Sequence, residues 1–252
     1  MAQRNPPNDP ELAAPFESGS VRTGTLVPMR TVEYAPGRLA DVFGGSTQPT
    51  ILLWHGQHSD ARATVRPLAE SIARHDAAVV VPDWDSSAPD GGRADLLRSI
   101  DFTRERANDA DGIELVGWSL GGVAAAGVTL DAARFDIALA HTVCIACPFM
   151  DRDPISGRPV SVGLSSDHVG SPFTLIHGLA DDIVPVQVSR AFAASLRRIG
   201  WPVDLLELTA DHWSIAGTEY DAFTKRYEPG KGGRAHSVAG EVAARIAATF
   251  GR

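Results

Sequence analysis

The feature of this sequence that most restricts its fold is a serine enclosed by glycines, in the stretch Gly-Trp-Ser-Leu-Gly at 117–121. An apolar run over residues 112–117 leads into it, and a pattern of small residues typical of a helix follows over 121–133. In a strand-to-helix turn of this kind the serine takes a strained backbone conformation that exposes its hydroxyl. A Cβ atom at Gly117 or Gly121 would crowd the neighbouring strand and helix.

This turn makes Ser119 a candidate nucleophile. Its hydroxyl would lie near the N-terminus of the following helix, where developing negative charge is stabilised. Glycine and serine are also common in ordinary turns, so the motif alone leaves open a turn without chemistry. A serine hydroxyl is a poor nucleophile at neutral pH and needs a base, usually a histidine oriented by a carboxylate. The next question is therefore whether such partners occur in the chain.

The remaining sequence alternates between apolar runs and amphipathic helical patterns. Continuous apolar runs are typical of strands buried on both faces, and their alternation with helices predicts a mostly parallel, doubly wound α/β sheet with helices on both faces. Residues 25–43 add short extended segments that suit an antiparallel edge. We expect strands over 50–54, 77–81, 112–117, 141–147, 172–176 and 203–208, and helices over 61–75, 92–107, 121–133, 188–199 and 238–250.

We expect one domain over residues 21–252, preceded by a flexible tail over 1–20. A chain of 252 residues can bury a sufficient core as a single unit. The polar segment 151–170 is too short for a full cap domain, so we predict an open site. That segment and the Gly-rich segment 214–236 are both candidates for a lid.

Composition and charge exclude several other classes of protein. The net charge of −8 would repel nucleic acids and anionic membranes. Residues 1–20 lack a signal-peptide pattern and no apolar run is long enough to span a membrane, so we expect a cytoplasmic protein. Cys144 and Cys147 are expected on opposite faces of one strand, as reduced core residues. No metal-ligand set or nucleotide fingerprint stands out, so no metal and no cofactor are expected. The oligomeric state is not predicted.

Candidate partners of the serine follow the predicted strands, since functional groups gather beyond the carboxyl ends of parallel strands. Three histidines are placed in this way: His55, His177 and His212. His212 follows the last strand and is our candidate base. His177 opens a turn with two adjacent carboxylates, Asp181 and Asp182, and is itself expected to pack or to order that turn. The chain order is then serine, aspartate, histidine.

In these motifs the sequence resembles the α/β-hydrolase superfamily, particularly its small esterase and dienelactone-hydrolase-like members. The resemblance spans roughly residues 22–250. It rests on His55-Gly56, on the serine motif, on the turn His177-Gly-x-x-Asp181-x-x-Val184-Pro185 and on His212. It implies that Asp181 is the acid, with Asp182 as the alternative.

An oxyanion formed at the serine needs preorganised N–H donors. The backbone N–H of Leu120, directly after the nucleophile, is expected to be one of them. The resemblance implies the N–H of Gln57 as the second, with His58 as the alternative, because the chain departs here from the Gly-rich pattern of many esterases. A tight turn without function is the other interpretation of His55-Gly56.

Trp118 and Trp213 adjoin the candidate nucleophile and base in sequence, so they are, with His58, candidates for the substrate pocket. Tryptophans in such positions are as often part of the core. The resemblance implies a serine hydrolase that cleaves a carboxylic ester of a small molecule. An amidase, a thioesterase or an inactive binding protein of the same fold is the alternative.

Overall fold

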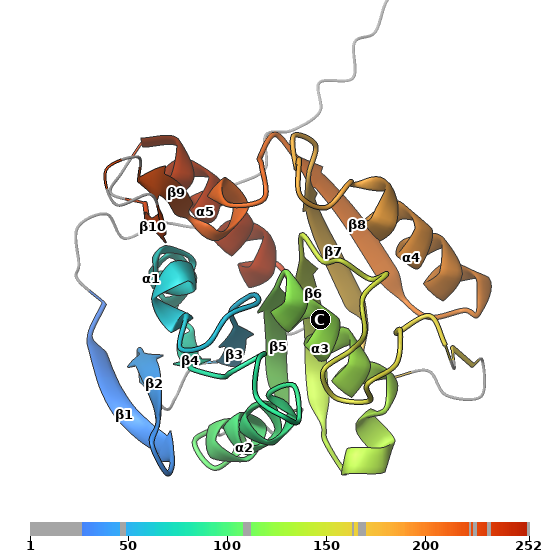
Figure 1. The fold of residues 1–252 in the computed structure, drawn as a ribbon, viewed down its shortest axis with the longest axis horizontal. Coiled ribbons are helices and arrows are strands. Elements are labelled where there is room, and N and C mark those ends of the chain that lie inside the picture. Colours follow the sequence, from blue (N-terminus) through green and yellow to red (C-terminus); the bar gives the residue numbers. More distant parts are fainter. Residues whose placement is uncertain are drawn as a thin grey trace, which may run out of the picture.

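The computed structural model describes residues 27–45, 49–107, 112–162, 164–165, 170–221, 223, 226–230 and 233–250. The predicted tail over 1–20 lies outside these residues. An eight-stranded sheet forms the centre of the fold, with strand order β1-β2-β4-β3-β5-β6-β7-β8 (Figure 1). Its strands are β1 Met29–Ala35, β2 Arg38–Phe43, β3 Thr50–Trp54, β4 Ala78–Pro82, β5 Ile113–Trp118, β6 Leu139–Ile145, β7 Phe173–Gly178 and β8 Val203–Leu208.

The sheet is parallel from β4 through β3 to β8, while β1 and β2 form the predicted antiparallel edge. Five α-helices flank it in the described residues, on both faces (Figure 1). These helices are α1 Arg66–Ala73, α2 Arg93–Arg104, α3 Leu120–Leu130, α4 Gln187–Arg198 and α5 Gly233–Ala247. The predicted doubly wound α/β architecture is thereby confirmed.

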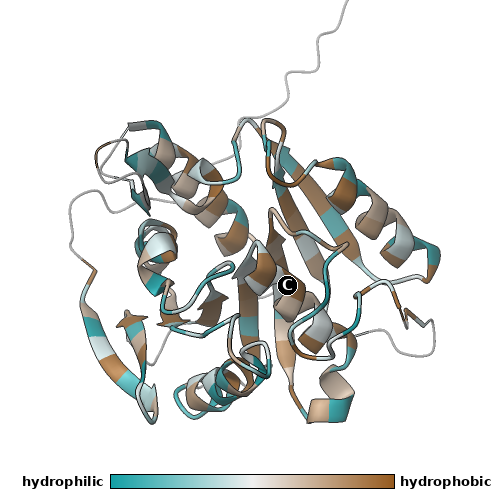
Figure 2. Ribbon diagram, viewed as in Figure 1, coloured by the Kyte–Doolittle hydropathy of each residue, from teal (hydrophilic) through white to brown (hydrophobic). Residues whose placement is uncertain are grey.

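The central strands are apolar throughout because both of their faces are covered. In β3, Ile51 and Leu53 pack with α1 and α5 on one face, whereas Leu52 and Trp54 pack with α2 and α3 on the other. A third apolar cluster joins α3 to α4 over β6 and β7. Figure 2 shows the same pattern as hydrophobic colour over the middle strands. Because helices cover both faces of the central strands, a substrate can reach this sheet only at the ends of the strands and not on its faces.

Two sequence expectations were wrong in detail. The segment expected to be a loop over 214–236 contains a short antiparallel hairpin, β9 Thr218–Asp221 with β10 Arg226–Pro229, and α5 already begins at Gly233. Cys144 and Cys147 do not face opposite sides, because both sulfur atoms lie against Gly122 of α3. The reason is the backbone between them: Ala146 has a φ of 51°, which ends the strand alternation and turns the second thiol back.

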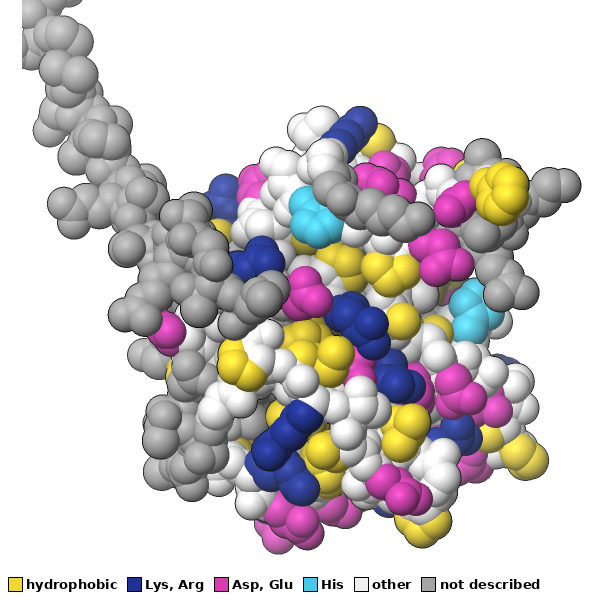
Figure 3. Space-filling view, turned by 90° about the vertical axis from the view of Figure 1, so that its left-hand side faces the viewer, with side chains coloured by type: hydrophobic (Ala, Val, Ile, Leu, Met, Phe, Trp, Pro, Cys, Tyr) yellow, Lys and Arg dark blue, Asp and Glu magenta, His cyan; other side chains and the backbone are white. Residues whose placement is uncertain are grey.

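Buried ion pairs tie the antiparallel edge to the rest of the molecule. The Asp41 carboxylate in β2 accepts hydrogen bonds from Arg62 at 3.1 Å and from Arg66 at 2.7 Å, and Arg62 also binds Asp83 after β4. On the face of the molecule at this edge, acidic and basic side chains are interspersed with apolar ones (Figure 3). These ion pairs therefore attach the segment between β3 and α1 to β2 and β4, in addition to its apolar packing. No helix in the described part of the chain is long and apolar enough to cross a bilayer.

The tight packing at the start of α3 leads to a stability prediction. A Cβ atom at Gly121 would overlap the backbone carbonyl oxygen of His55, and backbone cannot move aside as a flexible side chain can. We expect Gly121→Ala to lower the free energy of unfolding by about 1–3 kcal/mol or more, as measured by urea denaturation.

Gly240→Ala is the matched control. Gly240 lies inside α5 and a Cβ atom there meets nothing within 4 Å, so the substitution should raise stability by up to about 1 kcal/mol. Equal stability of Gly121→Ala and the unsubstituted protein would contradict the packing argument.

Candidate active site

The three residues expected to carry the chemistry follow three different strands. Ser119 comes directly after β5, Asp181 follows β7 and His212 follows β8. All three strands belong to the parallel part of the sheet, so their carboxyl ends share one edge. His55, after β3, belongs to the same edge.

Ser119 occupies a strained turn between β5 and α3. Its φ of 54° and ψ of −123° are rarely adopted by a residue with a side chain. The turn is held by the N–H of Ser119, which donates to the carbonyl of Ile145 at 2.8 Å. The predicted crowding is present, because a Cβ atom at Gly117 would overlap the carbonyl of Gly121 and one at Gly121 would overlap that of His55. The glycines therefore permit the conformation that presents the serine.

The side chains of Ser119, His212 and Asp181 form one chain of hydrogen bonds. His212 Nε2 lies 3.2 Å from Ser119 Oγ, and His212 Nδ1 lies 2.8 Å from Asp181 Oδ2. An ionised carboxylate only accepts, so Nδ1 carries a proton and Nε2 of the neutral ring is free to accept the serine hydroxyl. His212 is 2% exposed, which shields both contacts from water.

The Asp181 carboxylate is buried and surrounded by donors. Its Oδ1 accepts the backbone N–H groups of Ile183 at 3.0 Å and Val184 at 2.7 Å. Its Oδ2 faces His212 and also lies 3.3 Å from Nε2 of His177. Burial alone would raise the pKa of this carboxyl, but the hydrogen bonds from His177, His212 and the Val184 N–H outweigh it and hold the pKa well below its usual range. Asp181 is therefore ionised at neutral pH.

Asp182 is placed differently from its neighbour. It is exposed and lines, with Asp211 and Trp213, a surface cavity of about 630 Å³ beside the site. The structure brings Asp181, and not Asp182, to the imidazole of His212.

The expected oxyanion donors belong to two segments that meet at Ser119, the start of α3 and the loop after β3. Leu120 is the first residue of α3, where backbone N–H groups have no acceptor within the helix. The loop after β3 passes directly against Ser119, because a Cβ atom at Gly56 would lie 3.1 Å from the Cβ of Ser119. Gln57 is the next residue of that loop. The alternative donor, the N–H of His58, is already bonded to Ser86 Oγ at 3.0 Å.

His55 tethers the loop that carries Gln57, a role that the sequence did not reveal because its partner lies on another loop. Nδ1 of the buried ring is 2.8 Å from the carbonyl of Gly56, and Nε2 accepts the backbone N–H of Trp84 at 3.3 Å. The ring also stacks on Trp84, whose indole N–H donates to the carbonyl of His55 at 3.2 Å. Burial lowers the pKa of His55 to about 3, so the ring stays neutral and keeps both contacts.

Trp118 and Trp213 both contact the ring of His212. Trp118 is 3% exposed, and its indole N–H donates to the backbone carbonyl of His212 at 3.0 Å. Trp213 packs edge-on against Trp118 and His212, with ring centroids 5.5 and 5.4 Å apart, and lines the cavity beside Asp182. Trp118 is thus a buried residue that packs against the imidazole of His212, while Trp213 also reaches the surface.

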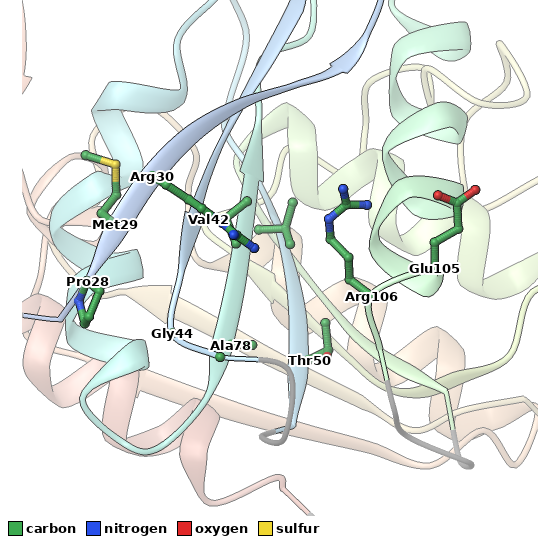
Figure 4. Close-up of a pocket in the computed structure, with 11 residues that line it drawn as sticks. Pro28, Met29, Arg30, Val42, Gly44, Thr50, Ala78, Glu105 and Arg106 are labelled. Atoms are coloured by element: carbon green, nitrogen blue, oxygen red, sulfur yellow. The ribbon is translucent and has the colours of Figure 1, made fainter.

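A separate cavity of about 610 Å³ opens at the opposite end of the strands. It lies beside Thr50 and Ala78, the first residues of β3 and β4, whereas Ser119 follows the last residue of the parallel strand β5. Figure 4 shows the side chains of Arg30 and Arg106 reaching toward its interior. This cavity is therefore remote from the serine. Among the residues that the structure describes, no three His, Cys, Asp or Glu side chains form a group that could hold a metal ion.

Comparison with known proteins finds similarity in structure rather than in sequence. No family model matches the sequence, and no curated protein matches it. The structure is similar to Thermogutta terrifontis esterase 2 phosphorylated by paraoxon, with a TM-score of 0.68 and 16% identity over 91% of this chain and 97% of that one. It is also similar to an inhibited esterase B from Lactobacillus rhamnosis, with a TM-score of 0.64 and 16% identity over 90% and 89% of the two chains.

A third similar structure is MGS-M1, an α/β hydrolase enzyme from a Medee basin deep-sea metagenome library. Its TM-score is 0.60 at 15% identity, over 77% of this chain and 86% of that one. At such low identities the likeness concerns the fold alone. The chain therefore has the α/β fold of these hydrolases, whose solved examples include esterases.

The buried neutral ring of His55 should make stability depend on pH. A histidine titrates near 6.5 in the unfolded chain and near 3 in the fold, so the unfolded state binds the extra proton between these values. The contribution of the neutral His55 ring to the stability of the fold is therefore complete above about pH 6.5 and is lost as the pH falls toward 3. The free energy of unfolding, measured with urea between pH 7 and 4, should fall as the pH falls. His55→Gln should reduce the slope of this free energy against pH by up to about 1.4 kcal/mol per pH unit. An unchanged slope in His55→Gln would contradict this account.

Proposed function

We propose that this protein is a serine hydrolase that cleaves a carboxylic ester of a small molecule. Ser119 is the nucleophile, His212 the general base and Asp181 the acid that orients it. The observation that carries the proposal is the continuous hydrogen-bonded chain of these three side chains, at 3.2 and 2.8 Å, at the carboxyl edge of the sheet. Further support comes from the strained turn at Ser119, which faces its hydroxyl toward the base.

In the first half of the reaction Ser119 Oγ attacks the ester carbonyl carbon while its proton passes to Nε2 of His212. The Asp181 carboxylate stabilises the imidazolium that forms, without itself taking the proton. The carbonyl oxygen becomes an oxyanion between the N–H groups of Leu120 and Gln57. The tetrahedral intermediate then collapses: the bond to the leaving oxygen breaks, His212 returns the proton to it, and an acyl-enzyme and an alcohol result.

In the second half a water molecule replaces the alcohol. His212 takes a proton from the water, whose oxygen attacks the acyl carbon, and the same donors hold the second oxyanion. Collapse of this intermediate breaks the bond to Ser119 Oγ and returns the proton to it, so that the acid is released and the enzyme is restored. Each oxyanion donor of this kind is worth about 10²–10³ in rate.

The ester class is favoured over its alternatives by the neighbouring structures, several of which are esterases. An amidase or a thioesterase would use the same three residues, since the preference resides in pocket shape. A relation to dienelactone-hydrolase-like esterases is part of the proposal, although the nucleophile here is a serine and not a cysteine. A series of p-nitrophenyl esters of increasing acyl length, beside matching amides and thioesters, would rank these substrates by kcat/KM.

Replacement of the nucleophile tests whether the protein is an enzyme. We expect Ser119→Ala to lower kcat on p-nitrophenyl acetate by about 10⁴-fold or more and to abolish labelling by a fluorophosphonate probe. The probe is apt because one structural neighbour is an esterase phosphorylated by paraoxon. Ser195→Ala is the matched control and should behave as the unsubstituted protein, because Ser195 is a partly exposed residue of α4 whose hydroxyl accepts only from Arg198 in the described contacts. A folded protein that neither hydrolyses esters nor reacts with the probe would instead be a binding protein.

The identity of the acid is tested by the two adjacent aspartates. Asp181→Asn should lower kcat by about 10⁴-fold, because the amide no longer holds His212 in the required tautomer or stabilises its positive charge. Asp182→Asn should leave kcat close to its original value, since that side chain is exposed. The assignment is wrong if Asp182→Asn is the more damaging change.

A further inference from the structure

A second histidine lies behind the acid. The His177 ring, at the end of β7, is completely buried, and its Nε2 lies 2.8 Å from the carbonyl oxygen of Val184 and 3.3 Å from Asp181 Oδ2. Both neighbours of this nitrogen are hydrogen-bond acceptors. A lone pair on Nε2 would face two negative oxygens without a proton between them, so Nε2 carries the proton and donates to both.

The other ring nitrogen of His177 has a partner on α4. Nδ1 lies 2.7 Å from the hydroxyl oxygen of Ser189, which is 1% exposed and lies in the first turn of that helix. With Nε2 protonated, Nδ1 of the neutral ring accepts the Ser189 hydroxyl proton. Ser189 therefore completes the hydrogen bonds of the His177 ring and holds the ring in its orientation toward Asp181, although it does not itself touch the triad.

We propose that His177 and Ser189 are positioning residues that hold the Asp181 carboxylate in place for His212. The inference rests on the proposed function. The two backbone N–H groups of the turn hold only Oδ1. Oδ2, the oxygen that contacts the catalytic base, receives its second donor from His177. This donor limits rotation of the carboxylate and shares its negative charge between two imidazoles.

Other ionisable groups around this arrangement are engaged or lie at its edge. Burial raises the pKa of the Cys147 thiol, so this neighbour of Asp181 stays uncharged. Glu207, which pairs with His177 across β7 and β8, is held at the surface by Arg190 at 2.6 and 2.8 Å. Asp182 and Asp211 line the cavity on the outer side of the site.

Three substitutions remove the contacts one at a time. His177→Leu removes the donor to Asp181, and Ser189→Ala removes the hydroxyl that holds the His177 ring at Nδ1. His177→Gln keeps a donor near the position of Nε2. We expect His177→Leu to lower kcat on p-nitrophenyl acetate by about 10- to 100-fold with little change in KM, since a hydrogen bond to a charged group is lost. Ser189→Ala should show a smaller decrease of the same kind, and His177→Gln should recover most of the loss.

The pH profile provides a readout that a purely structural role would not move. The acid limb of kcat/KM reports protonation of the base in the free enzyme. Without the donor from His177, the charge on Asp181 acts more fully on the imidazolium of His212, so the protonated form is favoured. The acid limb should therefore shift to higher pH in His177→Leu and return toward its original position in His177→Gln.

A similar buried pair in the same sheet serves as the control. His141 Nε2 in β6 lies 2.8 Å from Thr174 Oγ1 in β7, and both residues are buried. Thr174→Val removes a buried hydroxyl from a histidine, as Ser189→Ala does, but it leaves Asp181 untouched. It should lower stability without moving kcat or the acid limb, both measured well below the unfolding temperature.

The outcomes separate this inference from the proposed function. The positioning role is refuted if Ser189→Ala and His177→Gln keep the original kcat and acid limb, and if His177→Leu, where it folds, keeps them too. If Ser119→Ala is inactive at the same time, the proposed hydrolase function remains. If Ser189→Ala changes activity only as much as Thr174→Val, the pair is structural and the inference is likewise overturned. Ester hydrolysis that persists in Ser119→Ala would refute the proposed function itself.

Discussion

The site depends on a close approach between two backbones, the loop after β3 and the first turn of α3. Gly121 packs directly on the carbonyl of His55, where no Cβ atom fits. This contact brings the loop of Gln57 beside Ser119. The strained φ of 54° at Ser119 is sustained by the packing on either side of it, since few residues adopt such a conformation unaided. The turn at Ser119 and the approach of the loop that carries Gln57 both depend on this steric requirement.

A second constraint is the burial of a carboxylate. A charge removed from water is costly unless donors replace its hydration. The turn after β7 supplies them to Asp181 through two of its own N–H groups, while two histidines complete the set. The donors that make the charge tolerable also orient it. The stability of the turn after β7 and the orientation of the Asp181 carboxylate are therefore linked, because the loss of any one donor affects both.

Much of the fold was predictable because its physical signals are local. Central strands buried on both faces must be apolar throughout, and short runs of this kind between helical patterns are visible in a sequence. The hairpin β9–β10 was missed because its strands are short and polar. The shared orientation of Cys144 and Cys147 was missed because a positive φ at Ala146 has no signature in an alanine. In the structure the N–H of Ala146 still donates to the carbonyl of Ile176 on the neighbouring strand, so the chain leaves the sheet only after this residue.

The sequence by itself determined the order of the central strands and the helices, the glycines at 117 and 121, and the set of residues able to form a nucleophile, a base and an acid. It favoured Asp181 over Asp182 as the acid and His212 over His55 and His177 as the base, without showing which of these side chains meet. Only the tertiary structure shows which side chains meet: Asp181 lies 2.8 Å from His212, and the ring of His177 lies 3.3 Å from the same carboxylate oxygen. The physical reason is that neighbouring side chains after a strand point in different directions. Their directions depend on hydrogen bonds to residues that are distant in sequence.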